Sequence, residues 1–169
     1  VLWGGLLKSR KSAALPGAKI YPPTLTNSDL ANIKIAKEMG VTGVMQPFVR
    51  DHRDLECVKE ALREAGAEDI RLFAKIENMD GVRKLEELFP AADEIVIARG
   101  DLGNAVHLWD LPGVQRQISE KCRAAGKPFM VVTQMLASME RSPVPTRAEV
   151  NDIFHAVMDG AASIMVTGE

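Results

Sequence analysis

The stretch IRLFAKIENMDGVRKLEELFPAADEIVIARGD (residues 70–101) decides the fold. Two short apolar runs, residues 70–76 and 94–99, flank an amphipathic segment at residues 79–90. The runs are nearly continuous rather than alternating, which is typical of parallel strands buried on both faces. The segment between them has helical periodicity and runs into Pro90, which ends a helix. The stretch therefore predicts a strand, a helix and a second strand of a parallel sheet.

The same unit recurs along the chain. Further apolar runs lie at residues 41–49, 128–134 and 162–168, and amphipathic segments at residues 26–40, 51–66, 111–126 and 146–160. Thr26 with Asp29 and Thr146 with Glu149 have the spacing of helix capping boxes. The pattern predicts five strands alternating with helices.

The spacing of the strands favours a TIM (β/α)8 barrel. Strand centres are about 24 to 35 residues apart, the size of the units in a barrel of roughly 250 residues. An open doubly wound sheet is the alternative, but its glycine-rich phosphate fingerprint is absent, because ARGDLG (98–103) has only Gly100 and Gly103. Only about five of eight units are present. We also expect a segment of something longer, because the chain opens at Val1 without a methionine.

Composition narrows the class of protein. The chain has 169 residues, 46% of them apolar and 26% charged, with a formal net charge of -2. That charge argues against a nucleic-acid partner. No apolar run approaches the roughly 20 residues that span a membrane, so a cytoplasmic location is expected. Cys57 and Cys122 are isolated and fit no zinc or disulfide pattern.

Polar side chains gather where the predicted strands end, which is where barrel active sites lie. Lys75 and Glu77 are two positions apart and should face the same side of their strand. Glu77 and Asp101 could converge on one Mg²⁺, which takes one or two protein carboxylates, and Lys75 would add positive charge there. A solvated ion pair of Lys75 with either carboxylate is the alternative. Glycines flanking Asp101 favour the functional interpretation, because bare backbone allows close approach of a ligand.

Several motifs resemble the pyruvate kinase family. They are AKIEN (74–78), IVIARGDLG (95–103), GKPFMVVTQML (126–136), PTRAE (145–149) and DGAASIMVTGE (159–169), in this order. The resemblance implies that residues 1–24 return from a lid domain into the barrel. Residues 25–169 would then form a partial catalytic barrel without its first three strands. We expect the rest of the lid and the regulatory domain of the family to be absent as well.

The resemblance also implies an activity, in which a phosphoryl group moves between phosphoenolpyruvate and ADP to give pyruvate and ATP. Lys75 matches the lysine that stabilises the transition state, and Glu77 and Asp101 match the ligands of Mg²⁺ (or Mn²⁺). The backbone at Gly100 and the side chain of Thr133 match substrate contacts. Lys11 matches a nucleotide contact. A homo-oligomer without nucleic-acid or membrane partners is implied.

The sequence departs from the family at several points. Pro47 stands where the family has a serine near its monovalent-cation site, so whether the K⁺ requirement of the family holds for this chain stays open. NAVH (104–107) replaces a segment with glutamate and proline. In the family, the arginine that holds the substrate phosphate lies in the absent strands. We therefore expect the 169 residues alone not to catalyse phosphoryl transfer. A metal-dependent lyase or aldolase that forms a pyruvate enolate, and a non-catalytic paralogue, are the alternative functions.

Overall fold

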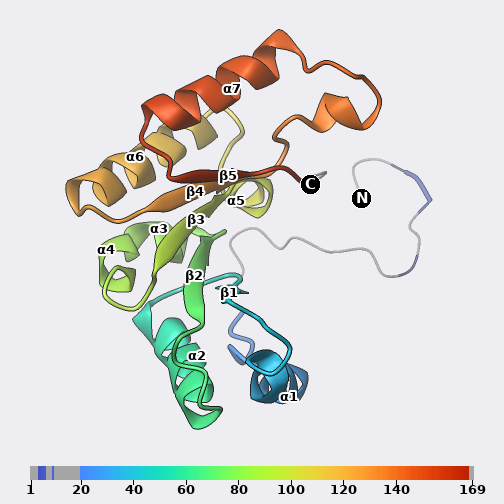
Figure 1. Cartoon of the computed structure of the whole chain (residues 1–169). Helices are drawn as coiled ribbons and strands as arrows, with labels where there is room; N and C mark the ends of the chain where they lie inside the picture. The colour runs from blue at the N-terminus through green and yellow to red at the C-terminus, as the bar shows by residue number, and fades with distance from the viewer. Residues whose placement is uncertain (1–3, 7–8, 10–19, 168–169) are drawn as a thin grey trace.

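A computed structural model describes residues 4–6, 9 and 20–167 of the chain. Within this part of the chain, five strands form one sheet in the order β1-β2-β3-β4-β5, and every neighbouring pair is parallel (Figure 1). The strands are β1 (Gly43–Gln46), β2 (Arg71–Ile76), β3 (Glu94–Ala98), β4 (Phe129–Val132) and β5 (Ser163–Met165). The five predicted strands and their parallel arrangement are confirmed.

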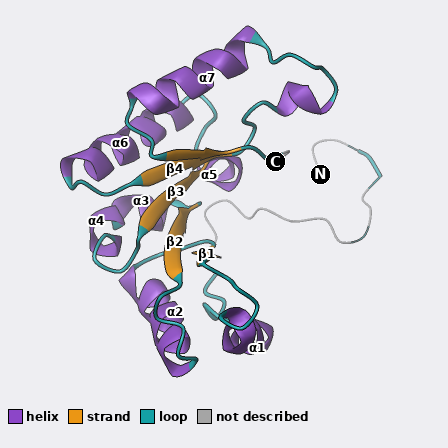
Figure 2. Ribbon diagram, in the orientation of Figure 1, coloured by secondary structure: helices purple, strands orange, loops and turns teal. Residues whose placement is uncertain are grey.

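Helices connect the strands and cover one side of the fanned sheet (Figure 2). They are α1 (Asn27–Ala36), α2 (His52–Glu64), α3 (Met79–Arg83), α4 (Leu85–Leu88), α5 (Arg99–Ala105), α6 (Leu111–Ala124), α7 (Arg147–Met158) and the 3₁₀ helix η1 (Ala137–Glu140). Both predicted capping boxes are present, at Thr26 with Asp29 and at Thr146 with Glu149. Each box satisfies backbone N–H groups that the first turn of a helix leaves unpaired.

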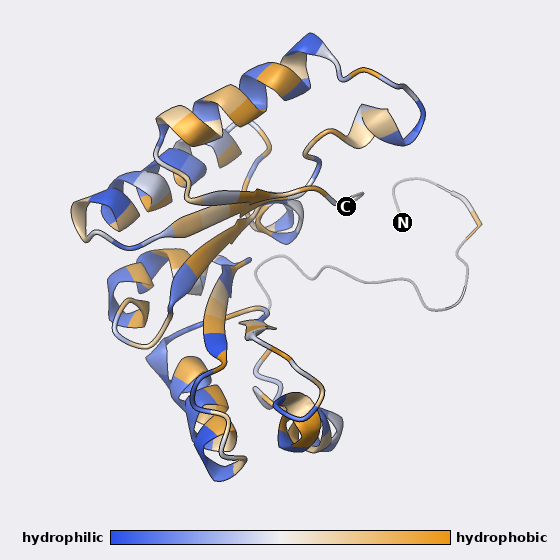
Figure 3. Cartoon of the chain, viewed as in Figure 1, coloured by the Kyte–Doolittle hydropathy of each residue, from blue (hydrophilic) through white to orange (hydrophobic). Residues whose placement is uncertain are grey.

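The two faces of the sheet bury different apolar clusters. Alternate residues of β2, among them Leu72 and Ile76, pack with the helices in the large core. The opposite face holds a smaller cluster centred on Val96, Ala98 and Val132. Apolar colour therefore runs along the strands in Figure 3, whereas the helices alternate apolar and polar surfaces. In a (β/α)8 barrel these two faces are the outer layer and the barrel interior.

The structure corrects three details of the predicted elements. The strand predicted over residues 41–49 ends at Gln46, because Pro47 follows and the next residue, Phe48, has a left-handed φ of 51°. The helix predicted over residues 79–90 is divided at Lys84, whose φ of -100° and ψ of 17° interrupt the helical turn. A short helix, α5, follows β3 without being expected.

The arrangement is that of a partial TIM barrel. No strand within the described residues pairs with the outer edge of β1 or of β5. Most of residues 1–24, and with them the predicted return from a lid domain, lie outside the described residues. Among the helices of the described part, none is long and apolar enough to cross a membrane.

Candidate functional site

Lys75 and Glu77 lie together at the carboxyl end of β2. Lys75 follows Phe73 on the face of the small apolar cluster, and the Lys75 Nζ is 2.8 Å from Glu77 Oε1. The Glu77 side chain is only 2% exposed, and that of Lys75 is 28% exposed. The prediction that both groups share one side of the strand is confirmed. The ammonium compensates a carboxylate that would otherwise be unfavourable at this depth.

The second oxygen of Glu77 has a partner that the sequence pattern did not reveal. The backbone N–H of Phe48 donates to Glu77 Oε2 at 2.7 Å. Phe48 can aim its amide at this oxygen because the chain leaves β1 at Pro47 and adopts the left-handed conformation. A short, charge-assisted bond of this kind fixes the carboxylate strongly.

Asp101 reaches the same region from the first turn of α5. Gly100, beside it, packs so closely against the residue after β4 that a Cβ at this position would lie 3.0 Å from Thr133 Cγ2. The backbone after β4 is unusual, with left-handed φ values at Thr133 (83°) and Gln134 (55°). Such conformations are costly for residues other than glycine and cluster at functional sites.

Five of the six predicted site residues line one cavity of about 470 Å³ at the carboxyl ends of the strands. They are Lys75, Glu77, Gly100, Asp101 and Thr133. The other lining residues are Met45, Val96, Ala98, Asn104, Val132, Met165 and Thr167. The sixth predicted residue, Lys11, lies outside the described residues. The cavity has a polar rim and an apolar floor built from the inner face of the sheet.

Arg99, which the sequence pattern did not single out, supports the site from outside the cavity lining. Its guanidinium donates to the carbonyl oxygens of Val132 (3.3 Å) and Thr133 (2.6 Å) and pairs with Asp152 of α7 at 2.7 Å. The side chain is 13% exposed. Arg99 therefore ties the start of α5 to the left-handed segment after β4. The available signal was an arginine placed at the end of a buried strand, directly before Gly100 and Asp101.

The donor set fits a hard divalent cation. Among the described residues, no three His, Cys, Asp or Glu side chains form a metal-binding group. Glu77 and Asp101 nevertheless line the same cavity, and Mg²⁺ commonly takes one or two carboxylates and completes its octahedron with water and substrate oxygens. These two residues are therefore the ones that would hold Mg²⁺.

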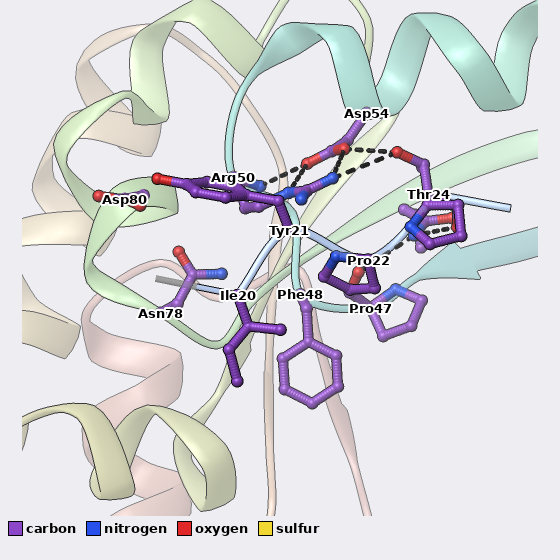
Figure 4. Close-up of a pocket in the computed structure, with 12 residues that line it drawn as sticks. Ile20, Tyr21, Pro22, Thr24, Pro47, Phe48, Arg50, Asp54, Asn78 and Asp80 are labelled. Carbon is purple, nitrogen blue, oxygen red and sulfur yellow. Dashed lines mark hydrogen bonds and ion pairs between the residues drawn. The ribbon is translucent and has the colours of Figure 1, made fainter. Parts of the chain in front are cut away.

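Figure 4 shows a second cavity, of about 460 Å³, which shares no lining residue with the first. Its walls come from residues 20–24, from the turn after β1 and from the start of α3. Arg50, the basic side chain among its lining residues, is paired with Asp54 at 2.6 Å. The lining includes neither Lys75 nor Asp101, so we assign the chemistry to the first cavity.

The histidines and cysteines, all of which lie in the described part of the chain, do not line the candidate site. His107 stacks on Trp109, with ring centroids 4.7 Å apart, and His52 lies 3.4 Å from Glu87. Burial raises the pKa of the Cys122 thiol to about 12, which leaves it protonated and unreactive at neutral pH.

The fold and the cavity define the class: a (β/α)8-barrel protein with an acidic, lysine-containing site at the carboxyl ends of its strands. The family model for the pyruvate kinase barrel domain matches residues 1–169. The chain belongs to the pyruvate kinase family.

Individual relatives agree with this assignment. The pyruvate kinase of Geobacillus stearothermophilus is 40% identical over 169 residues, which are 100% of this chain and 29% of the relative. The protein named pyruvate kinase PKLR from Homo sapiens is 42% identical over 166 residues, 98% of this chain and 29% of its own length. A pyruvate kinase of Dictyostelium discoideum is 40% identical over 163 residues, 96% of this chain and 32% of its length. The chain thus spans about a third of these relatives.

Proposed function

We propose that this chain forms five of the eight strand units in the catalytic barrel of a pyruvate kinase. The intact protein would transfer a phosphoryl group between phosphoenolpyruvate and ADP to give pyruvate and ATP. The observation that carries the proposal is the meeting of Lys75, two carboxylates and the Gly100–Thr133 contact in one cavity. Phosphoryl transfer depends on positioning and on charge neutralisation more than on covalent chemistry, and these side chains supply both.

Each residue has a distinct role in this proposal. Glu77 and Asp101 would hold Mg²⁺ or Mn²⁺, which when bound neutralises charge on the transferred phosphoryl group. The Lys75 ammonium stabilises the negative charge that develops on the enolate oxygen. The backbone at Gly100 binds the substrate, and Thr133 lies against it near the methylene carbon.

The other participants follow from the same assignment. Lys11 would contact the nucleotide. Pro47 has no hydroxyl, so its side chain offers no ligand to K⁺. We also propose that the intact protein forms a homo-oligomer and lies in the cytoplasm, in keeping with a glycolytic role.

The decisive experiment is the substitution Lys75→Met in the intact protein. We expect ADP-dependent formation of pyruvate to fall about 10²- to 10³-fold, because one charge stabiliser of the transition state is lost. Lys59→Met is the matched control, since Lys59 is exposed on α2 and should leave the rate unchanged. Pyruvate formation is measured by coupling it to lactate dehydrogenase. Binding of Mn²⁺ to each variant is titrated in parallel.

The two other functions would give different results. Cleavage or condensation of a pyruvate-forming substrate without nucleotide would indicate a lyase or aldolase, to which the altered segment at residues 104–107 would then belong. Binding of Mn²⁺ with neither activity would indicate a non-catalytic relative. Either result from the unmodified intact protein would overturn the proposed kinase.

A further inference from the structure

The turn after β1 is fastened to the end of β2 by three hydrogen bonds. The Phe48 N–H donates to Glu77 Oε2 (2.7 Å), and the Val49 N–H donates to the Lys75 carbonyl (3.3 Å). In the opposite direction, the Asn78 Nδ2 donates to the Val49 carbonyl at 3.1 Å. The Asn78 bond comes from a side chain, so a substitution at Asn78 removes it and leaves both backbone donors in place.

Asn78 makes a second bond that fixes its orientation. Its Oδ1 accepts the N–H of Gly81 at 2.9 Å and thereby caps α3. An inverted amide would point Nδ2 at that N–H and Oδ1 at the Val49 carbonyl, so both bonds require the same orientation. The amide therefore bridges the start of α3 and the turn after β1.

The space around the turn is also closed from the side of α3. A Cβ on Gly81 would lie 2.6 Å from the Val49 carbonyl oxygen, a distance that non-bonded atoms do not tolerate. Val49 itself is fully buried, whereas Phe48 is 55% exposed. Figure 4 shows Phe48 and Asn78 at the wall of the second cavity. Buried Val49 therefore anchors the turn, and its exposed neighbour Phe48 donates to Glu77.

We propose that Asn78 is a positioning residue, which holds the Phe48–Val49 turn and through it the carboxylate of Glu77. The terminal torsion of a glutamate has a broad energy minimum, so a fixed external donor decides where its oxygens point. The Phe48 amide occupies Oε2, and Oε1 is the oxygen shared with Lys75. The inference rests on the proposed function only in assigning Glu77 to a divalent cation.

The competing explanation is that Asn78 serves only as a helix cap, and two substitutions separate the roles. Asn78→Ser keeps a good capping oxygen for the Gly81 N–H but has no donor that reaches Val49. Asn78→Ala loses both bonds. A cap-only role predicts that the serine variant behaves like the unmodified protein, whereas a positioning role predicts that the serine and alanine variants share one defect at Phe48.

Amide hydrogen exchange in the intact protein gives a readout that needs neither metal nor activity. We expect exchange of the Phe48 N–H to accelerate about tenfold in both variants, since the turn that carries this donor is no longer held at Val49. The Gly81 N–H should stay protected in Asn78→Ser and lose protection in Asn78→Ala. A Phe48 amide in Asn78→Ser that exchanges at the unmodified rate would overturn the inference.

Manganese binding tests the consequence for Glu77. With Mn²⁺ alone as the probe, we expect both variants to bind about tenfold more weakly, the range found when groups supporting a metal ligand are removed. Equal affinity of Asn78→Ser and the unmodified protein would overturn the inference. If the unmodified protein binds no Mn²⁺, the proposed function fails, and the exchange of Phe48 still decides the positioning role.

A second variant covers the case in which Asn78→Ser does not fold. Gly81→Ala leaves Asn78 intact and places a methyl group against the Val49 carbonyl. We expect the same faster exchange at Phe48 and the same weaker Mn²⁺ binding. Full protection of Phe48 in this variant would then contradict the proposed coupling.

Discussion

At the scale of single residues, the negative charge of the buried Glu77 carboxylate is balanced by the neighbouring Lys75 ammonium. Glu77 is almost completely buried, accepts a hydrogen bond from a backbone amide and forms an ion pair with the Lys75 ammonium. A divalent cation that approaches Oε1 meets the Lys75 ammonium already there, and two cations repel each other at this range. Lys75 therefore acts both as a partner of the carboxylate and as a competitor of the metal.

This competition leads to a prediction about affinity rather than rate. We expect Lys75→Met to tighten binding of Mn²⁺ about tenfold, on the order of 1.4 kcal/mol, because the competing charge is removed. Lys59→Met, on the exposed side of α2, should bind as the unmodified protein does. Isothermal titration of the intact protein with Mn²⁺, without substrate, measures both. Unchanged or weaker binding in Lys75→Met would mean that the ammonium does not compete at Oε1.

At the scale of elements, the features that depend on residues close together in the sequence were predicted correctly. Apolar runs located all five strands, and side-chain alternation placed Lys75 and Glu77 on one face, because both depend on residues that are near in sequence. The capping boxes were recognisable for the same reason. The carboxyl ends of adjacent strands meet at one edge, which is why Asp101 and Thr133 were also placed in the site.

The unpredicted features depend on contacts between distant segments. The helix α5 begins at Arg99, whose side chain is fixed by β4 and by Asp152, 53 positions further along. The Phe48 amide points at Glu77 because Phe48 has a left-handed φ. Phenylalanine is unusual in this conformation, so the residue type gave no signal of the turn. Periodicity carries no information about either contact.

One element boundary should be sensitive to acid. Glu149 caps α7 and accepts bonds from Ser138 of η1, and the Ser138 hydroxyl, the Ser138 and Thr146 amides and the Thr146 hydroxyl lower its pKa from 4.5 to about 2. A pKa lowered by folding gives stability that is present above the unfolded value and lost as the pH falls toward the folded value. The contribution should therefore disappear between about pH 4.5 and about pH 2.

The substitution Glu149→Gln tests this expectation. The glutamine cannot ionise, so we expect the variant to be less stable than the unmodified protein at pH 7, with the difference shrinking toward zero near pH 2. Urea unfolding at a series of pH values measures it. Glu140→Gln is a control of the same chemistry on η1, where no hydrogen bond to the carboxylate is seen among the described residues. A difference that is constant with pH would refute the role of the Glu149 charge.

At the scale of the whole molecule, β1 and β5 each have an edge with no neighbouring strand among the described residues, and the helices carry exposed apolar residues. On α7, Val150, Phe154, Val157 and Met158 are each more than half exposed. Unpaired edge strands and apolar patches are the features by which chains associate. The chain covers 29% of the relative from Geobacillus stearothermophilus, and three further strand units would complete an eight-stranded barrel.

We therefore expect residues 1–169, produced alone, to self-associate and to bind the dye ANS. Fusion to the remaining barrel strands of the Geobacillus stearothermophilus relative should suppress both, because β1 and β5 would gain neighbours and their backbone groups would be paired. An unrelated domain of equal size, fused at the same end, is the control, since it adds bulk without strands of matching register. Sedimentation velocity and dye fluorescence measure the two properties. A monomeric isolated segment that binds no dye would show that the edges are already protected, and the open partial barrel would then be wrong as a description of this segment in solution.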